Sequence, residues 1–123
     1  VDERVAQDAS MVAKAIRPDY ALGGHTASLG LCWLPEGTLP GFGAGMAIGQ
    51  HVSSNRSTLS GYRVVFVPFA NGKPSGPPRD ILWGFLSPDE KYSYGRPVGV
   101  SLAPGGGILV ADDVGDVIWR VTG

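Results

Sequence analysis

The sequence predicts an all-β fold, because it is rich in turn-forming residues and because its second half repeats its first. Glycine and proline make up 29 of the 123 residues, which is about twice their average share and favours many short elements over helices. Gly30 reappears as Gly99, and Pro35 as Pro104, both at an offset of 69 residues and each within a similar run. Such self-similarity indicates a repeated unit whose apolar face needs a neighbouring unit to cover it.

Each copy of the repeat divides into short strands separated by turns. In the first copy we expect strands at residues 26–34, 45–50, 62–69 and 80–86, with a hairpin turn at Asn71 and Gly72. In the second copy we expect strands at 97–102, 108–111 and 117–122, with tight turns at 104–106 and 113–115. Four antiparallel strands in up-and-down order form one blade of a β-propeller. The chain should therefore hold about two four-stranded antiparallel blades, the second stopping after its third strand.

The first residues differ from the rest. Val5, Ala9, Val12 and Ile16 recur at helical spacing, which predicts a short amphipathic helix that Pro18 ends. A frayed, irregular segment is the alternative. We therefore divide the chain into a helical or irregular lead-in at residues 1–17 and propeller blades at residues 18–123.

Composition excludes several classes of partner. The net charge is −1 and no basic stripe is present, so we expect no nucleic-acid partner. No apolar run reaches the length of about 18 residues that a membrane span needs. Cys32 is the only cysteine, which rules out an internal disulfide and predicts a buried thiol. We expect the three tryptophans to lie in the core, since they occur in strand-like runs: Trp33, Trp83 and Trp119.

Up-and-down connectivity sorts the polar residues before any chemistry is assumed. In each blade, the loop before the first strand and the loop between the second and third strands emerge at the same end. That end gathers the residues that could carry a function: His25, His51, Asn55, Arg56, Tyr92, Tyr94, Arg96, Asp112 and Asp113. The loop at 50–60 is long, whereas its counterpart in the second copy is a short turn. Extra length in one loop of a repeat indicates the functional face.

These residue types suit a flat ligand that carries several carboxylates or phosphates. Guanidinium groups pair with carboxylates in a bidentate manner and stack on ring faces, and histidine can donate or transfer a proton. The alternative is a set of ordinary solvated loop residues. The acidic cluster Asp112, Asp113 and Asp116 does not match the spacing of a calcium loop, and a capped turn is favoured. We assign no metal ligand and no catalytic residue from the sequence.

Several runs of this chain resemble a known family. Residues 49–57 and 61–69, residues 95–100, and residues 110–113 with 118–121 are similar to the C-terminal part of sorbosone dehydrogenases. These belong to the soluble glucose/sorbosone dehydrogenase group, which are six-bladed propellers that use pyrroloquinoline quinone (PQQ). The resemblance covers roughly residues 18–123.

The resemblance implies a PQQ cofactor and a set of residues that contact it. Arg96 aligns with an arginine that contacts PQQ in the glucose dehydrogenases, whereas the second arginine of that pair is Val98 here. A lysine that contacts the quinone falls within residues 51–56, where this chain has no lysine. His51, Asn55 and Arg56 are therefore candidates for cofactor binding beside Arg96, together with His25.

The resemblance further implies oxidation of a sugar hydroxyl or aldehyde, in the periplasm or outside the cell. The family's catalytic histidine and calcium ligands lie in earlier blades, so we expect this chain to be incomplete for catalysis alone. It is either the C-terminal portion of a longer enzyme or one of three copies that complete a ring. The alternative function is a non-catalytic propeller module for binding or oligomerisation. A calcium-dependent lactone hydrolase on a related propeller is disfavoured, because the acidic residues for its metal are not evident.

Overall fold

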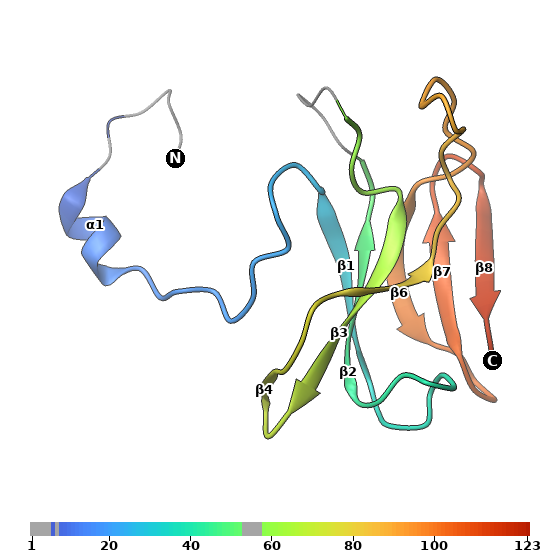
Figure 1. Cartoon of the computed structure of the whole chain (residues 1–123), viewed down its shortest axis with the longest axis horizontal. Helices are drawn as coiled ribbons and strands as arrows, with labels where there is room; N and C mark the ends of the chain where they lie inside the picture. The colour runs from blue at the N-terminus through green and yellow to red at the C-terminus, as the bar shows by residue number, and fades with distance from the viewer. Residues whose placement is uncertain (1–5, 7, 53–57) are drawn as a thin grey trace.

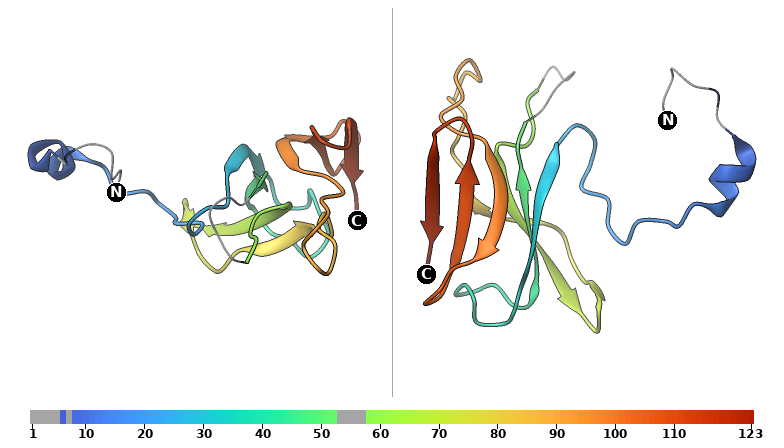
Figure 2. Two further views of the ribbon diagram at one scale, coloured as in Figure 1. Left: turned by 90° about the horizontal axis from the view of Figure 1, so that it is seen from above. Right: turned by 180° about the vertical axis from the view of Figure 1, so that it is seen from behind.

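A computed structural model describes residues 6, 8–52 and 58–123, and these form two antiparallel sheets with a short helix apart from them (Figure 1). The two sheets stand side by side with their faces in contact, whereas the helix is joined to the first sheet by an extended segment (Figure 2). The predicted all-β fold with one short helix is confirmed.

The first sheet is an up-and-down meander. Its strands β1 (Ser28–Leu34), β2 (Gly45–Gln50) and β3 (Arg63–Ala70) pair in sequence order, and β5 (Arg79–Leu82) pairs with the other edge of β3. A two-residue strand β4 (Lys73–Pro74), which the sequence did not predict, closes a hairpin with the end of β3. The predicted turn joins them, since Asn71 and Gly72 both have positive φ, as a tight hairpin turn requires.

The second sheet repeats the first three strands of this plan. It consists of β6 (Pro97–Leu102), β7 (Ile108–Asp112) and β8 (Val117–Val121), again paired in sequence order. The predicted strands 45–50 and 97–102 have the bounds of β2 and β6. The predicted strand 80–86 is wrong beyond Leu82, because Gly84 has a φ of 95° and turns the chain away from β3. Beyond that point Leu86 forms only a single bridge with Ser93.

The core lies between the two sheets. Leu34, Ala47 and Phe66 of the first sheet pack with Ile108 and Val110 of the second, and none of these side chains is exposed. The repeat's apolar positions therefore cover one another, as its periodicity predicted.

Two glycines allow the sheets to approach closely. A Cβ at Gly30 or at Gly49 would overlap the carbonyl oxygen of Val98 in the facing strand β6. Any other residue at either position would therefore force the sheets apart. Gly30, one of the residues by which the repeat is recognised in the sequence, is thus required for close packing between the two copies.

The opposite face of the first sheet is only partly covered. Ile48, Val65 and Val67 form a second cluster there, against which Tyr20 and Leu22 of the preceding segment pack. Leu31 and Ile48 line a hollow of about 250 Å³ on this face, and Leu31 remains 65% exposed.

The prediction that the tryptophans lie in the core is wrong: Trp33 is 44%, Trp83 67% and Trp119 42% exposed. Trp33 alternates with the inward-facing Cys32 and Leu34, so it lies on the other face, edge-on to Phe69. Trp83 follows the end of β5. Cys32 is half-buried at the edge of the core rather than fully buried as expected. Strand-like runs predicted the strands correctly but not which sheet faces are covered.

The helix α1 (Ala9–Lys14) is confirmed within the predicted lead-in. The carboxylate of Asp8 caps it by accepting hydrogen bonds from the backbone N–H groups of Ser10 and Met11. None of its residues is buried, so its apolar side packs against no other element that the structure describes. It ends at Lys14, before Pro18, because Ala15 is already extended. In the described part of the chain, no helix is long and apolar enough to span a membrane.

Candidate functional site

The loops that the sequence placed at one end do emerge together, at the top of the molecule in Figure 1. The segments before β1 and β6, the chain after β2 and the turn between β7 and β8 all lie there. The opposite end carries the hairpin turn at Asn71 and the connections 35–44 and 103–107. The sorting of loops by meander topology is therefore confirmed.

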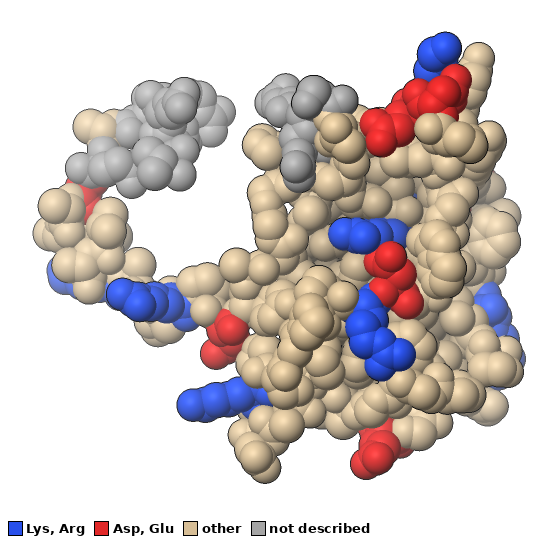
Figure 3. Space-filling model, viewed as in Figure 1, with Lys and Arg blue, Asp and Glu red and all other residues tan. Residues whose placement is uncertain are grey.

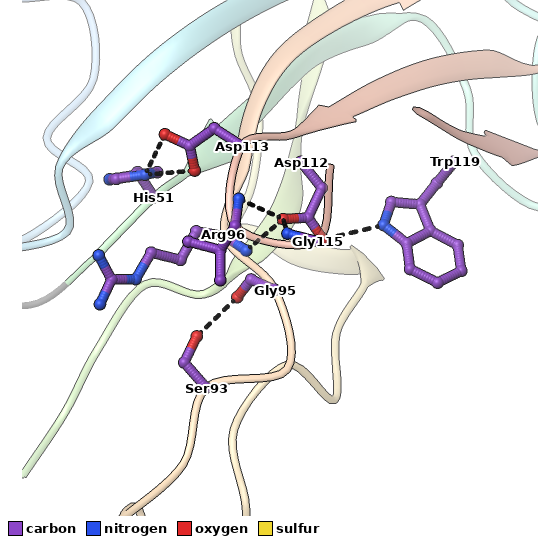
Figure 4. A network of polar contacts seen from close by, with 9 residues as sticks. His51, Ser93, Gly95, Arg96, Asp112, Asp113, Gly115 and Trp119 are labelled. Carbon is purple, nitrogen blue, oxygen red and sulfur yellow. Dashed lines mark hydrogen bonds and ion pairs between the residues drawn. The ribbon is translucent and has the colours of Figure 1, made fainter. Parts of the chain in front are cut away.

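Asp112 organises this end. The residue is 3% exposed, and its carboxylate accepts four hydrogen bonds, from the backbone N–H groups of Arg96, Val114 and Gly115 and from the Trp119 indole Nε1–H, at 2.9–3.1 Å (Figure 4). Burial raises the pKa of this carboxyl, but the donated hydrogen bonds outweigh burial, so the pKa lies below its usual value. The expected capped turn is confirmed, and Asp112 serves structure rather than ligand binding.

Arg96 is fixed at its backbone by this turn. Its N–H donates to Asp112 at 2.9 Å, and Gly95 precedes it because a Cβ there would overlap the Asp112 carboxylate. The guanidinium lies 5.8 Å from the ring centroid of Tyr62, within the range of a cation–π interaction. The Arg96 Nε is buried and makes no hydrogen bond with the residues that the structure describes. A buried donor without a partner is uncommon and points to a missing acceptor.

His51 is held from the other side of the junction. It follows β2 of the first sheet, and its Nε2 lies 2.9 and 3.0 Å from the two carboxylate oxygens of Asp113, which follows β7 of the second sheet (Figure 4). Its side chain is 17% exposed, and its backbone N–H donates to the carbonyl oxygen of Ala27 at 3.0 Å. His51 is therefore fixed both by its ring and by its backbone.

The remaining candidates are less closely integrated. His25 is exposed at a φ of 59°, and its carbonyl oxygen accepts a hydrogen bond from the hydroxyl of Ser60 at 3.1 Å. Tyr92 and Tyr94 are 66% and 62% exposed. Asn55 and Arg56 lie outside the described residues. Of the predicted set, the structure thus brings together His51, Arg96, Asp112 and Asp113.

Sequence reasoning missed Tyr62. The sequence predicts Tyr62 as the first residue of a strand, but it lies just before β3, is 6% exposed and has a φ of 55°. Its position directly after the long loop, at the same end of the blade, was the signal that could have identified it.

The site lies at the surface rather than in an enclosed cavity. A hollow of about 260 Å³ is lined by Tyr62 together with Arg63 and Trp83. On the face that Figure 3 shows, basic and acidic side chains are interspersed and no stripe of one sign appears. Within the described ranges, no three His, Cys, Asp or Glu side chains come close enough to hold a metal ion. We call the part of this end that carries His51 and Arg96 the rim. Its imidazole and guanidinium can bind an anion with several acidic groups.

Two antiparallel sheets with the same up-and-down strand order, packed face to face, are two adjacent blades of a β-propeller. The chain is similar to the holo form of the PQQ domain of pyranose dehydrogenase from Coprinopsis cinerea, with a TM-score of 0.67 and 26% identity. That likeness covers 87% of this chain and 29% of the other, and it confirms the predicted propeller blades. An uncharacterized protein of Borreliella burgdorferi is 33% identical over 110 residues, which cover 88% of this chain and 29% of that protein. No family model matches the chain.

Proposed function

We propose that this chain is part of a PQQ-dependent sugar dehydrogenase of the sorbosone dehydrogenase type, and that it supplies one rim of the cofactor site. The proposal depends most on one observation: the Arg96 side chain has a buried Nε that finds no partner among the described residues, at the end of the blades where the polar loops meet. The likeness to a PQQ domain supports the cofactor class. The chain spans 29% of that domain, so the activity and the sugar substrate belong to the whole protein.

The residues at this rim fit the cofactor. PQQ is planar and carries three carboxylates, which suit a guanidinium and an imidazole donor. Among the described residues, no ion pair joins the Arg96 guanidinium to an acidic side chain: Asp112 accepts from backbone N–H groups and from Trp119, and Asp113 contacts His51. When bound, PQQ supplies the oxidising group that accepts hydride from the sugar. Arg96 would bind a carboxylate, and His51, whose Nε2–H donates to Asp113, would donate a hydrogen bond to the cofactor from Nδ1 in its protonated form.

The other cofactor candidates remain part of the proposal. His25 belongs to the segment before β1, which emerges at the same end, and Asn55 and Arg56 follow His51 in the sequence. Calcium, expected in the complete family fold, would be held by residues outside this chain. A periplasmic or secreted location follows from the same resemblance. The division into a lead-in at 1–17 and blades at 18–123 is supported by the exposed helix and by the packing of Tyr20 against the first sheet.

Further blades would cover the exposed faces of the two sheets. In the repeat, Ala47 corresponds to Leu109. Ala47 faces the junction, whereas Leu109 lines a hollow on the outer face of the second sheet with Ala111 and Ile118. That outer face is thus equivalent to the one on which the second sheet already docks. It suits another blade, from a longer chain or from a further copy.

A non-catalytic module for binding or oligomerisation is the second candidate. It is favoured by the exposed apolar faces, since Leu31 is 65% and Ile118 70% exposed. Such faces mark interaction surfaces whatever the chemistry at the rim.

A PQQ titration of the whole chain, followed by fluorescence, separates the two candidates. We expect wild-type chain to bind PQQ and Arg96→Ala to weaken binding at least about tenfold, since a charge-assisted hydrogen bond is lost. Lys73→Ala removes one positive charge from an exposed residue at the opposite end and should leave binding unchanged. Absence of binding, or equal binding by Arg96→Ala, contradicts the cofactor proposal and favours the non-catalytic module.

A further inference from the structure

The two basic groups of the rim are each carried by one sheet and held by the other. His51 follows β2 of the first sheet and is held by Asp113 of the second. Arg96 precedes β6 of the second sheet, and its guanidinium lies over Tyr62, which precedes β3 of the first. Figure 4 shows His51, Asp113 and Arg96 close together at the junction. The contacts are reciprocal, so neither basic group is placed by its own sheet alone.

Asp113 is not needed to form its turn. Its neighbour Asp112 accepts the hydrogen bonds that close the turn, from Val114 and Gly115. Both carboxylate oxygens of Asp113 instead contact His51 Nε2, and among the described residues they have no other hydrogen-bond partner. Its side chain is 57% exposed, so burial does not explain its position either. What Asp113 does in the structure is orient the His51 ring.

Tyr62 supports Arg96 without neutralising it. The face of an aromatic ring attracts a guanidinium without accepting hydrogen bonds from the N–H groups that lie in the guanidinium plane. Those N–H groups remain available to an anion. A carboxylate in the same place would occupy them. Tyr62 is buried and has a φ of 55°, a conformation that is strained for a bulky residue. Such strain persists only where the surrounding structure imposes it and is typical of functional sites.

The spacing between the two basic groups is set by the junction itself. The backbone N–H of Arg96 is bound to the carboxylate of Asp112. Gly30 and Gly49 lie directly against Val98 in the same strand that Arg96 precedes. Arg96 and His51 are therefore placed relative to each other by rigid backbone contacts, and only their side-chain orientations depend on Tyr62 and Asp113.

We propose that Asp113 and Tyr62 are positioning residues for a planar polycarboxylate ligand: Asp113 orients His51, and Tyr62 orients Arg96. The inference rests on the proposed function, because it takes this rim as the ligand-binding one. It adds two residues that act through the basic groups without touching the ligand. A rim of this kind binds the ligand only when both sheets are docked.

Two separate readouts test the inference on the whole chain. The first is side-chain NMR without any ligand, which follows the ring nitrogens of His51 and the Nε–H of Arg96. We expect Asp113→Asn to shift the His51 ring signals and Asp113→Glu to restore them in part. We expect Tyr62→Leu to shift the Arg96 Nε signal, whereas Tyr62→Phe keeps it. Unchanged signals in Asp113→Asn and Tyr62→Leu overturn the positioning roles, whatever binds at the rim.

The second readout is PQQ affinity in the same variants. We expect Asp113→Asn and Tyr62→Leu each to weaken binding about tenfold, while Tyr62→Phe stays within about twofold of wild type. If Asp113→Asn and Tyr62→Leu both bind PQQ as tightly as wild type, the inference is overturned and the proposed function is left intact. No binding by wild type overturns the proposed function instead. Asp113 is exposed, so its variants should fold and decide the question even if Tyr62→Leu does not fold.

Discussion

Gly49 lies so close to the carbonyl oxygen of Val98 that no side chain fits between the two sheets. Gly49→Ala should therefore disrupt the junction, since its Cβ would overlap backbone that cannot rotate away. We expect a loss of about 2–4 kcal/mol in the free energy of unfolding, measured by urea denaturation. Gly43→Ala is the matched control, because a Cβ there meets no atom within 4 Å. Equal stability of the two variants would contradict the tight junction.

The buried carboxylate of Asp112 predicts a second large loss of stability on substitution. Asp112→Asn keeps an oxygen for the three backbone N–H groups that donate to Oδ1, but replaces Oδ2 by an NH₂ donor that faces the Trp119 indole Nε1–H, so both of these donors lose an acceptor. Leaving buried donors unpaired costs about 1–3 kcal/mol each, so we expect a loss of at least about 2 kcal/mol in the free energy of unfolding. Asp116→Asn is the control, because Asp116 is exposed and asparagine tolerates its positive φ of 52°. A loss of the same size in both variants would show that the hydrogen bonds of Asp112 are unimportant.

The same carboxylate predicts a dependence of stability on pH. The pKa of Asp112 is lowered in the folded chain, because the hydrogen bonds it accepts outweigh its burial. The stabilisation is therefore fully present above the unfolded pKa of about 3.9 and is lost as the pH falls through the lower, folded pKa.

We expect the difference in unfolding free energy between wild type and Asp112→Asn to be constant between about pH 5 and 7 and to shrink below about pH 4. Urea denaturation of both chains at several pH values measures that difference. Comparing the two chains cancels the contribution of the other carboxyl groups. A difference that stays constant down to about pH 2 would contradict the lowered pKa of Asp112.

The sequence predicted the meander and the end of the blade at which the polar loops meet, because both follow from local patterns. Alternation and turn residues located β2 and β6 to the residue. It could not predict which faces are covered, and so Trp33 was placed in the core although it is 44% exposed. Alternation separates two faces of a strand but does not say which one another sheet covers.

The sequence could not predict the individual side-chain contacts of the site either. Topology grouped His51 with Asp113, but their 2.9 Å contact depends on the docking angle of two sheets. The contact of Tyr62 with Arg96 depends on the same docking and on a backbone conformation that tyrosine rarely adopts. A single sequence carries no signal of such long-range geometry.

The exposed faces of the two sheets predict association of the chain with itself. The outer face of the second sheet is equivalent to the face on which that sheet docks, so copies can stack head to tail through unlike faces. Light scattering at several concentrations should therefore show a molar mass that rises above one chain. Three copies of two blades would complete a six-bladed ring.

Leu31→Glu places a charge in the apolar hollow of the first sheet and should reduce the mass to that of one chain. Ile16→Glu makes the same kind of change at a residue that is 95% exposed and lies outside both faces, so it should behave as wild type. A single chain at every concentration would contradict self-association. The remaining blades of a longer protein would then be the partners of these faces, because an apolar hollow beside an incompletely covered cluster still requires a cover.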